Sequence, residues 1–267
     1  MTAHRDDILK ELGLWPVWRL REPAAPAQYA SAPVRHAPAA HAVTAPMDAV
    51  KAAPVRAAPR VSAVLPLDAR AAEIAQMEWP QLRESVAGCV ACPLHKGRTK
   101  TVFGVGDEEA AWLFVGEGPG AEEDAKGEPF VGQAGKLLDN MLAAIDLKRG
   151  QNVYITNMVK CRPPGNRNPE PGEVAQCEPY LHRQIALIKP KLIVALGKVA
   201  AVNLLKRDAA VASMRGKLHE YQGIPLIVTY HPAYLLRSLP EKAKAWVDLR
   251  FAVDTMEALK SGQAATI

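Results

Sequence analysis

The chain has 267 residues, enough for one substantial domain with an appendage, and 49% of them are hydrophobic. Its formal net charge of +5 is compatible with a polyanionic partner but identifies none. No run approaches the roughly 18 apolar residues of a membrane span, and the first segment, MTAHRDDILKELGLW, lacks the apolar stretch of a signal peptide, so we expect a cytoplasmic protein.

Residues 6–14, DDILKELGL, predict a short amphipathic helix, because the aliphatic side chains share one face and two acidic residues lie in the first turn. Trp15 and Trp18 follow directly. Residues 1–22 are therefore either a docking peptide for a protein partner or a helix that folds back onto the domain.

Residues 23–66 consist mainly of Ala and Pro, with scattered Val, Arg and His. They lack the aromatic and long aliphatic side chains that would offset the entropy lost on ordering. We expect residues 23–68 to form a disordered linker that gives the chain a disordered N-terminal extension, and residues 69–262 to form the globular domain.

The chain has four cysteines, and we expect them to bind a metal or a cluster rather than to form disulfides. Cys89 and Cys92 form a CxxC pair, which lets two thiolates reach one metal or cluster from a single turn. Cys161 and Cys177 are widely separated, and folding must bring them to the first pair. Counting cysteines does not separate zinc from iron, but the wide second spacing favours a four-iron cluster over a zinc ribbon.

Four apolar runs predict buried β-strands, separated by segments of helical periodicity. The predicted strands are residues 111–116, 152–157, 191–197 and 225–230, and the predicted helices are residues 133–145, 172–188, 198–206 and 242–260. This alternation is typical of an α/β fold with a mainly parallel sheet covered on both faces. Ligands bind beyond the carboxyl ends of such strands, so we expect residues 117–120, 157–161 and 231–233 to surround one crevice.

A glycine-rich, acidic loop, GEGPGAEEDAKGEPFVGQAGKLL at residues 116–138, follows the first of these strands. It is not a phosphate-binding P-loop, because Phe130 stands where that motif needs a glycine and Leu137 follows the lysine. Its glycines match a dinucleotide fingerprint, but Pro119 removes a backbone donor and the acids at 122–124 would repel a pyrophosphate.

The loop instead favours a neutral planar ligand, which backbone amides can approach at the glycines. Phe130 would supply a ring on which a base stacks, although packing in the core is the alternative. Asn157 ends the second strand and offers a donor and an acceptor side by side, the pattern that reads a nucleobase edge. His231 ends the fourth strand and, when neutral, can donate to an oxygen that gains negative charge.

Five segments between residues 80 and 260 carry a more specific pattern: CVACPLHKGRTKTVFGVG, GEGPGAEEDAKGEPFVGQAGKLLDNML, YITNMVKCRPPGNRNPEPGEVAQC, KLIVALG and YHPAYLLR. Together they resemble the family 4 uracil-DNA glycosylases, the iron–sulfur branch of the uracil-DNA glycosylase superfamily. The resemblance implies a three-layer α/β/α fold with a central four-stranded parallel sheet, and excision of uracil from DNA without strand cleavage. It also implies a [4Fe-4S] cluster on Cys89, Cys92, Cys161 and Cys177.

The resemblance also implies which residues handle the base. Backbone groups of Glu117 and Gly118 would line the uracil pocket, Phe130 would stack on the flipped base, Asn157 would read its edge and His231 would face its O2. The best-known branch of the superfamily, family 1, has an aspartate at the position of Gly118. We therefore expect Glu123 to help stabilise the sugar cation or to position water, with Asn166 as a second water-positioning group.

For DNA contact, we expect basic residues to hold phosphates and apolar residues to wedge into the base stack. The candidates are Lys160, Arg162, Arg167, Leu235, Leu236 and Arg237. Ordinary helix packing is the alternative for the two leucines.

The predicted function is a monomeric, monofunctional DNA-repair glycosylase that flips uracil out of single- or double-stranded DNA and hydrolyses its N-glycosidic bond. Residues 69–262 would be its catalytic domain. A bifunctional lyase would need an amine in the pocket, for which Lys136 is the nearby candidate in the glycine-rich loop. The sequence is also compatible with a related glycosylase of different base preference, and with a non-catalytic iron–sulfur protein that binds nucleic acid.

Overall fold

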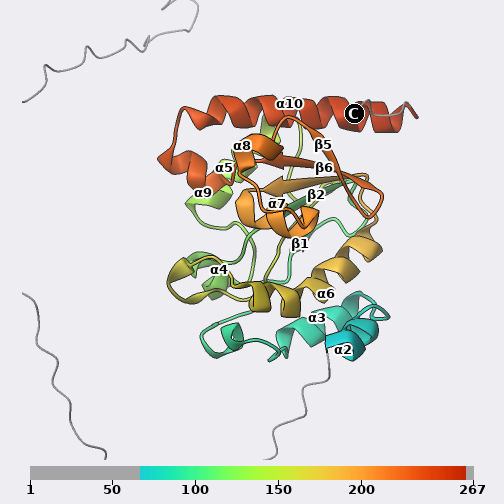
Figure 1. Ribbon diagram of the computed structural model, residues 1–267, viewed down its shortest axis with the longest axis vertical. Helices are drawn as coiled ribbons and strands as arrows, with labels where there is room; N and C mark the ends of the chain where they lie inside the picture. The colour runs from blue at the N-terminus through green and yellow to red at the C-terminus, as the bar shows by residue number, and fades with distance from the viewer. Residues whose placement is uncertain (1–66, 263–267) are drawn as a thin grey trace, which may run out of the picture. The chain divides into compact units, whose positions relative to one another are not determined.

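The computed structural model describes residues 67–262, which belong to the second of two compact units of the chain, Arg60–Ile267 (Figure 1). The predicted peptide at 1–22 and nearly all of the predicted linker at 23–68 lie outside the described residues. The predicted domain at 69–262 lies within them.

The centre of the fold is a sheet whose four central strands run parallel, as predicted. They are β2 (Trp112–Gly116), β3 (Val153–Asn157), β4 (Leu192–Leu196) and β6 (Ile224–Thr229), in the spatial order β3-β2-β4-β6. Every residue of β2, β3 and β4 is buried, which explains why their sequences are largely apolar runs without alternation.

Two further strands lie at the edges of the sheet and run antiparallel to their neighbours. β1 (Val105–Gly106) pairs with β3, and β5 (Leu218–Tyr221) pairs with β6. The sequence predicts neither, because β1 is very short and β5, LHEY, is only partly buried and has no apolar run. The sheet therefore has six strands, and the predicted four form its parallel centre.

The predicted helices are observed within a few residues of their expected bounds. They are α5 (Gln133–Ala143), α6 (Pro171–Ile188), α7 (Lys198–Leu205) and α10 (Glu241–Lys260). The structure adds α2 (Leu67–Ile74), α3 (Trp79–Ala87), α4 (Ala121–Lys126), α8 (Val211–Met214) and α9 (Pro232–Arg237), with 3-10 turns at Pro93–Lys96 and Pro164–Asn166. Among the described helices, none has the length and apolar character needed to cross a membrane.

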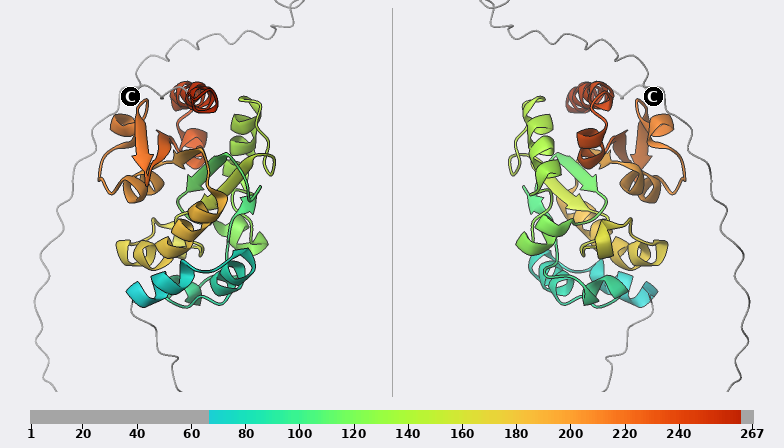
Figure 2. Two further views of the ribbon diagram at one scale, coloured as in Figure 1. Left: turned by 90° about the vertical axis from the view of Figure 1, so that its right-hand side faces the viewer. Right: turned by 90° about the vertical axis from the view of Figure 1, so that its left-hand side faces the viewer.

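Helices cover both faces of the sheet (Figure 2). Because successive side chains of a strand point to opposite faces, Leu113 and Val115 pack with residues of α6 and α7, whereas Trp112 and Phe114 pack with residues of α5 and α10. The result is the expected three-layer α/β/α arrangement. Helices α2 and α3 pack against α6 (Figure 1).

The four parallel strands bring their carboxyl ends to one edge of the sheet. In the strand register Gly116 is opposite Asn157, and Leu196 is opposite Thr229. The loops that follow these residues therefore meet, which is the crevice that the sequence predicts.

A tight turn precedes α5 and sets the position of Phe130. Phe130 has a φ of 54°, in the left-handed region that non-glycine residues rarely adopt. Gly135, in the first turn of α5, lies against it: an added Cβ would be 1.8 Å from the Phe130 carbonyl oxygen. Glycine at 135 is thus required for the turn that holds Phe130 in this conformation.

We expect Gly135→Ala to lower the free energy of unfolding by about 1–3 kcal/mol, because the backbone must move to accommodate the new methyl group. Gly172→Ala is the matched control, since Gly172 lies in the first turn of α6 and an added Cβ would meet nothing within 4 Å. This control is expected to be neutral or stabilising by up to about 1 kcal/mol. Urea denaturation measures both values, and equal stabilities would contradict the close approach.

Candidate active site

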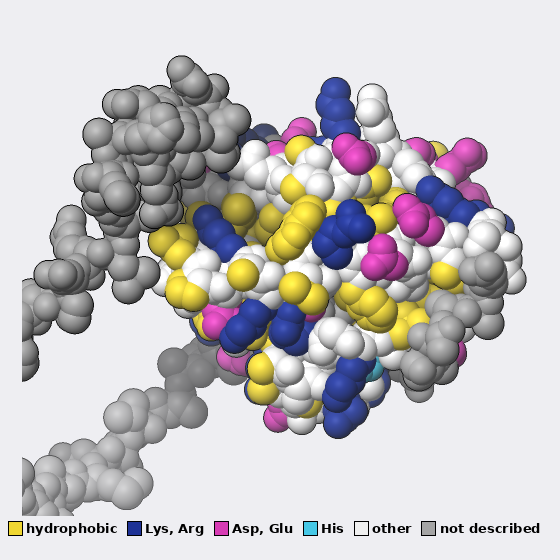
Figure 3. Space-filling view, turned by 90° about the horizontal axis from the view of Figure 1, so that it is seen from above, with side chains coloured by type: hydrophobic (Ala, Val, Ile, Leu, Met, Phe, Trp, Pro, Cys, Tyr) yellow, Lys and Arg dark blue, Asp and Glu magenta, His cyan; other side chains and the backbone are white. Residues whose placement is uncertain are grey.

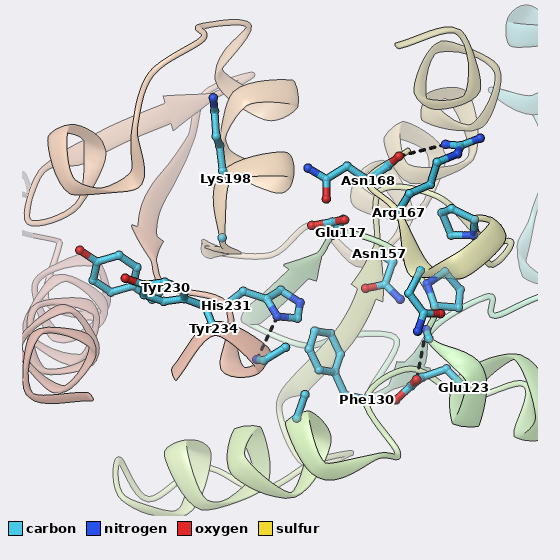
Figure 4. Close-up of a pocket in the computed structure, with 18 of the residues that line it drawn as sticks. Glu117, Glu123, Phe130, Asn157, Arg167, Asn168, Lys198, Tyr230, His231 and Tyr234 are labelled. Carbon is cyan, nitrogen blue, oxygen red and sulfur yellow. Dashed lines mark hydrogen bonds between the residues drawn. The ribbon is translucent and has the colours of Figure 1, made fainter. Parts of the chain in front are cut away.

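A cavity of about 660 Å³ lies at the carboxyl ends of the parallel strands (Figure 4). Residues after all four of these strands line it, together with residues of α4, α5 and the loop before α6. Of the residues predicted from sequence, the cavity brings together Glu117, Gly118, Glu123, Phe130, Asn157, Asn166, Arg167, His231 and Arg237.

Asn157 and Phe130 meet at the floor of the cavity, beside Gly116. An added Cβ at Gly116 would lie 2.4 Å from Asn157 Oδ1 and 2.6 Å from Phe130 Cζ, so only glycine allows both side chains to take these positions. Asn157 is 2% exposed, and its Oδ1 has no hydrogen-bond partner among the described residues. A buried, unpaired acceptor costs free energy, so Asn157 Oδ1 is an acceptor ready for a ligand.

His231 faces the cavity as a neutral ring. Its Nδ1 accepts a hydrogen bond from the Ala233 N–H at 3.1 Å, which leaves the proton on Nε2. Burial lowers the pKa of His231 to about 4, with a further lowering by the nearby Arg237 charge. The Phe130 ring lies 5.4 Å away between ring centroids. The site therefore holds an N–H donor without a full positive charge.

The two carboxylates of the cavity differ in their surroundings. Glu123 Oε1 accepts from the Val131 and Gly132 N–H groups at 2.9 and 3.0 Å, and Oε2 accepts from the Gly120 N–H at 3.1 Å. Glu123 thus ties the start of α4 to the turn before α5. For Glu117, by contrast, burial raises the pKa, and no hydrogen bond to its carboxylate is found within residues 67–262.

Two of the predicted DNA contacts are wrong, because the side chains are buried. Lys160 is 1% exposed, and its ammonium is bound by acceptors inside the fold. Leu235 is also 1% exposed and packs in the core between α5, α9 and α10. The neighbouring Leu236 is 41% exposed, because consecutive residues of a helix point to different sides.

The three predicted arginines differ in the hydrogen-bond partners of their guanidinium groups. Arg167 lines the cavity but binds Glu173 through two hydrogen bonds, of 2.9 and 2.7 Å. Arg162 Nε donates to Asn166 Oδ1 at 2.7 Å. Arg237 also lines the cavity. On the α10 side of the described domain, basic and acidic side chains are scattered among hydrophobic and uncharged ones (Figure 3).

Several cavity residues are not among those predicted from sequence. Lys198 directly follows Gly197 at the end of β4, so the strand-end rule that located the other loops applies to it as well. Tyr230 and Tyr234 also line the cavity and stack on each other at 5.2 Å. A short apolar segment does not reveal which tyrosine faces a cavity, so the sequence carried no signal for them.

The four cysteines meet at a second, smaller cavity, as the sequence predicts. Cys89, Cys92, Cys161 and Cys177 all line it. Three of their sulfur atoms accept hydrogen bonds: Cys177 from the Lys160 N–H at 3.2 Å, Cys161 from Arg98 at 3.2 Å and Cys89 from Arg70 at 3.5 Å. These donors favour the thiolate form that binding to a metal or cluster requires.

The burial of the cysteines opposes the charged thiolate form unless a bound cation stabilises it. Burial raises the pKa of Cys92 and of Cys161, and it raises the pKa of Cys177 to about 12. Within the described residues, no group of three or more His, Cys, Asp or Glu side chains is arranged so that it could hold one metal ion.

Comparisons with known proteins agree with this geometry. A profile of the family described as the uracil DNA glycosylase superfamily matches residues 103–250, which include every residue lining the larger cavity. The type-4 uracil-DNA glycosylase of Archaeoglobus fulgidus is 49% identical over 159 residues, 57% of this chain and 79% of that protein. The type-4 enzyme of Pyrobaculum aerophilum is 44% identical over 171 residues, 60% of this chain and 86% of that protein. The type-4 enzyme of Thermotoga maritima is 42% identical over 180 residues, 67% of this chain and 91% of that protein.

The contacts of Glu123 predict a large effect of Glu123→Gln on stability. An amide group cannot accept all three backbone N–H bonds, so we expect the free energy of unfolding to fall by about 1–3 kcal/mol. Glu122→Gln, in the same first helical turn but exposed, should change stability by less than about 0.5 kcal/mol. Urea denaturation measures the free energy of unfolding of both variants. A Glu123→Gln variant as stable as the control would refute the role of Glu123 in tying the start of α4 to the turn before α5.

The surroundings of His231 predict that its ring stays neutral to unusually low pH. Because burial lowers the pKa to about 4, the ring should remain uncharged as pH falls from about 8 to about 5. Nitrogen chemical shifts of the imidazole, followed by NMR through a pH titration, measure this directly. A titration midpoint near the ordinary value of about 6.5 would contradict the neutral donor.

Proposed function

Because the chain belongs to the uracil DNA glycosylase superfamily, we propose that it is a DNA-repair hydrolase that removes uracil from DNA and leaves an abasic site. The observation that carries the proposal is the pairing of an unsatisfied Asn157 oxygen with a neutral His231 donor, on either side of one buried ring. A neutral His231 can donate to an oxygen that gains negative charge, a step that occurs in bond cleavage and not in binding alone.

The base would be read by Asn157 and supported by Phe130. Uracil carries an N–H at position 3 beside a carbonyl at position 4, so it can donate to the free Asn157 Oδ1 and accept from the amide nitrogen. With the Asn157 amide in the orientation of the structure, cytosine, which has no N–H at that ring position and an amino group in place of the carbonyl, would leave both Asn157 atoms without a partner. This mismatch gives the site a preference for uracil.

The nucleotide must leave the base stack before its glycosidic bond can be reached. Extrusion costs unstacking and unpairing energy, which is smallest for a mismatch or a single strand. Leu236 is an exposed apolar side chain directly before the cavity-lining Arg237, and it is the candidate for filling the gap left in a duplex. Arg162, Arg167, Arg237 and the exposed Lys198 are the candidates for holding the flanking phosphates. The monomeric state and a docking role for residues 1–22 stay predictions.

Cleavage of the bond places negative charge on uracil and positive charge on the deoxyribose. The Nε2–H of His231 would donate to uracil O2 as that oxygen gains charge, and a donor of this kind lowers a barrier by about 3 kcal/mol. On the sugar side, the contacts favour Glu117 over Glu123, because only Glu117 keeps its carboxylate free of backbone donors. Glu117 would stabilise the sugar cation and orient water together with Asn166, while Glu123 holds the loop.

The cysteine set supports a [4Fe-4S] cluster held by Cys89, Cys92, Cys161 and Cys177. When bound, a cluster of this kind supplies four fixed iron–sulfur bonds and a one-electron redox centre. In this fold it would join the segment after α3, the segment after β3 and helix α6.

Release of free uracil from a uracil-containing oligonucleotide tests the proposed function. The wild-type protein should release uracil, and His231→Ala should lower the rate by roughly a hundredfold or more, the equivalent of one lost donor. His182→Ala, which removes a partly exposed histidine of α6 outside the cavity, is the control and should retain the wild-type rate. No release by the wild type would refute the proposed activity, and a fully active His231→Ala variant would refute the role of His231.

A further inference from the structure

Lys160 stands out because it is a lysine without access to solvent. It follows β3 by three residues, is 1% exposed and ranks among the largest fully buried side chains of the described domain. Lysine is almost never fully buried unless its charge has partners. The burial of Lys160 therefore requires partners for its ammonium group.

The ammonium group of Lys160 has a full set of acceptors. Nζ donates to Thr156 Oγ1 at 2.6 Å, to Gln184 Oε1 at 2.7 Å and to the Asn157 carbonyl oxygen at 2.9 Å. An ammonium group has three N–H donors, so this shell uses all of them. All three acceptors are uncharged, and no carboxylate forms an ion pair with Lys160 among the described residues.

The backbone of Lys160 is fixed on the opposite side, at the cysteine cavity. Its N–H donates to Cys177 Sγ at 3.2 Å, and its carbonyl oxygen accepts from the Val102 N–H at 2.7 Å. The next residue is Cys161. Lys160 therefore contacts the cysteine site with its backbone and the end of β3 with its side chain.

Asn157 needs support of this kind, because its side-chain oxygen is unpaired and contributes nothing to its own orientation. The peptide after Asn157 is held from two sides: the Met158 N–H donates to the Gly116 carbonyl at 2.9 Å, and the Asn157 carbonyl accepts from Lys160. With both groups of this peptide bound, the Cα–Cβ direction of Asn157 is set, and its side chain is presented to the cavity without a ligand.

We propose that Lys160 is a positioning residue for base recognition, which fixes the backbone of Asn157 from behind the cavity and links it to the cysteine site. The inference rests on the proposed uracil excision and deepens it. Lys160 does not touch the base. It acts through Asn157, and its loss should weaken uracil binding itself rather than only the stability of the fold.

The test compares Lys160→Met with Thr156→Val. Both variants remove buried hydrogen bonds of the same network, including the bond between Lys160 and Thr156, but only Lys160→Met frees the Asn157 carbonyl. The inhibition constant of free uracil should rise by at least about tenfold in Lys160→Met, about 1.4 kcal/mol, and stay within about threefold of wild type in Thr156→Val. The unfolding free energy should fall in both variants.

The double variant Lys160→Met/Gln184→Met covers the case in which Lys160→Met alone does not fold. It removes the lysine together with its acceptor Gln184 Oε1, while the Thr156 hydroxyl keeps the Phe103 carbonyl oxygen as a partner, so fewer buried polar atoms are left unpaired. It should show the same weakened inhibition by uracil. Inhibition constants equal to that of Thr156→Val, in a folded variant lacking Lys160, would reduce Lys160 to a packing residue and overturn the inference. Absence of uracil release by the wild type would instead refute the proposed function, so the two failures are distinguishable.

Discussion

At Gly116, the end of β2 passes so close to Asn157 and Phe130 that an added Cβ would lie 2.4 Å from Asn157 Oδ1. This close approach is the constraint on which the cavity depends. It brings the Asn157 side chain at the end of β3 and the Phe130 ring of the turn before α5 to one point. Two other glycines allow a similar close approach. Gly135 packs against the Phe130 carbonyl, and at Gly197 an added Cβ would lie 2.8 Å from His231 Cβ. These three glycines thus make room for the side chains and backbone of the cavity residues rather than for a phosphate.

The polar groups of the cavity are held in protonation and hydrogen-bonding states that differ from those they adopt in water. Asn157 keeps an unpaired oxygen, His231 stays neutral through burial and its bond from Ala233, and Glu117 carries a carboxylate whose pKa burial raises. Each arrangement costs stability. The surrounding network offsets the cost, with Glu123 bound to three backbone N–H groups on one side and the Lys160 ammonium on the other. A site prepared in this way needs little rearrangement when charge develops on a substrate.

Much of the fold could be predicted, because strong periodicity marks long buried elements. The four parallel strands, the four main helices and the meeting of their loops followed from apolar runs and the strand-end rule. The edge strands escaped because β1 is too short to show a pattern. The direction in which individual side chains point was harder to predict from the sequence. Sequence alone did not reveal that Lys160 turns inward, since its acceptors Thr156 and Gln184 come from separate elements that meet only in the folded chain. For the same reason, the acids of the glycine-rich loop gave no sign that Glu123 would bind backbone amides.

The central claim is that a neutral His231 and an unpaired Asn157 together read and release a uracil ring stacked on Phe130. The most direct measurement is a crystal structure of the protein with free uracil. We expect uracil O2 within hydrogen-bonding distance of His231 Nε2, the Asn157 amide paired with N3 and O4, and the ring lying on Phe130. Uracil bound elsewhere, or bound here with Asn157 Oδ1 still unpaired, would contradict this claim.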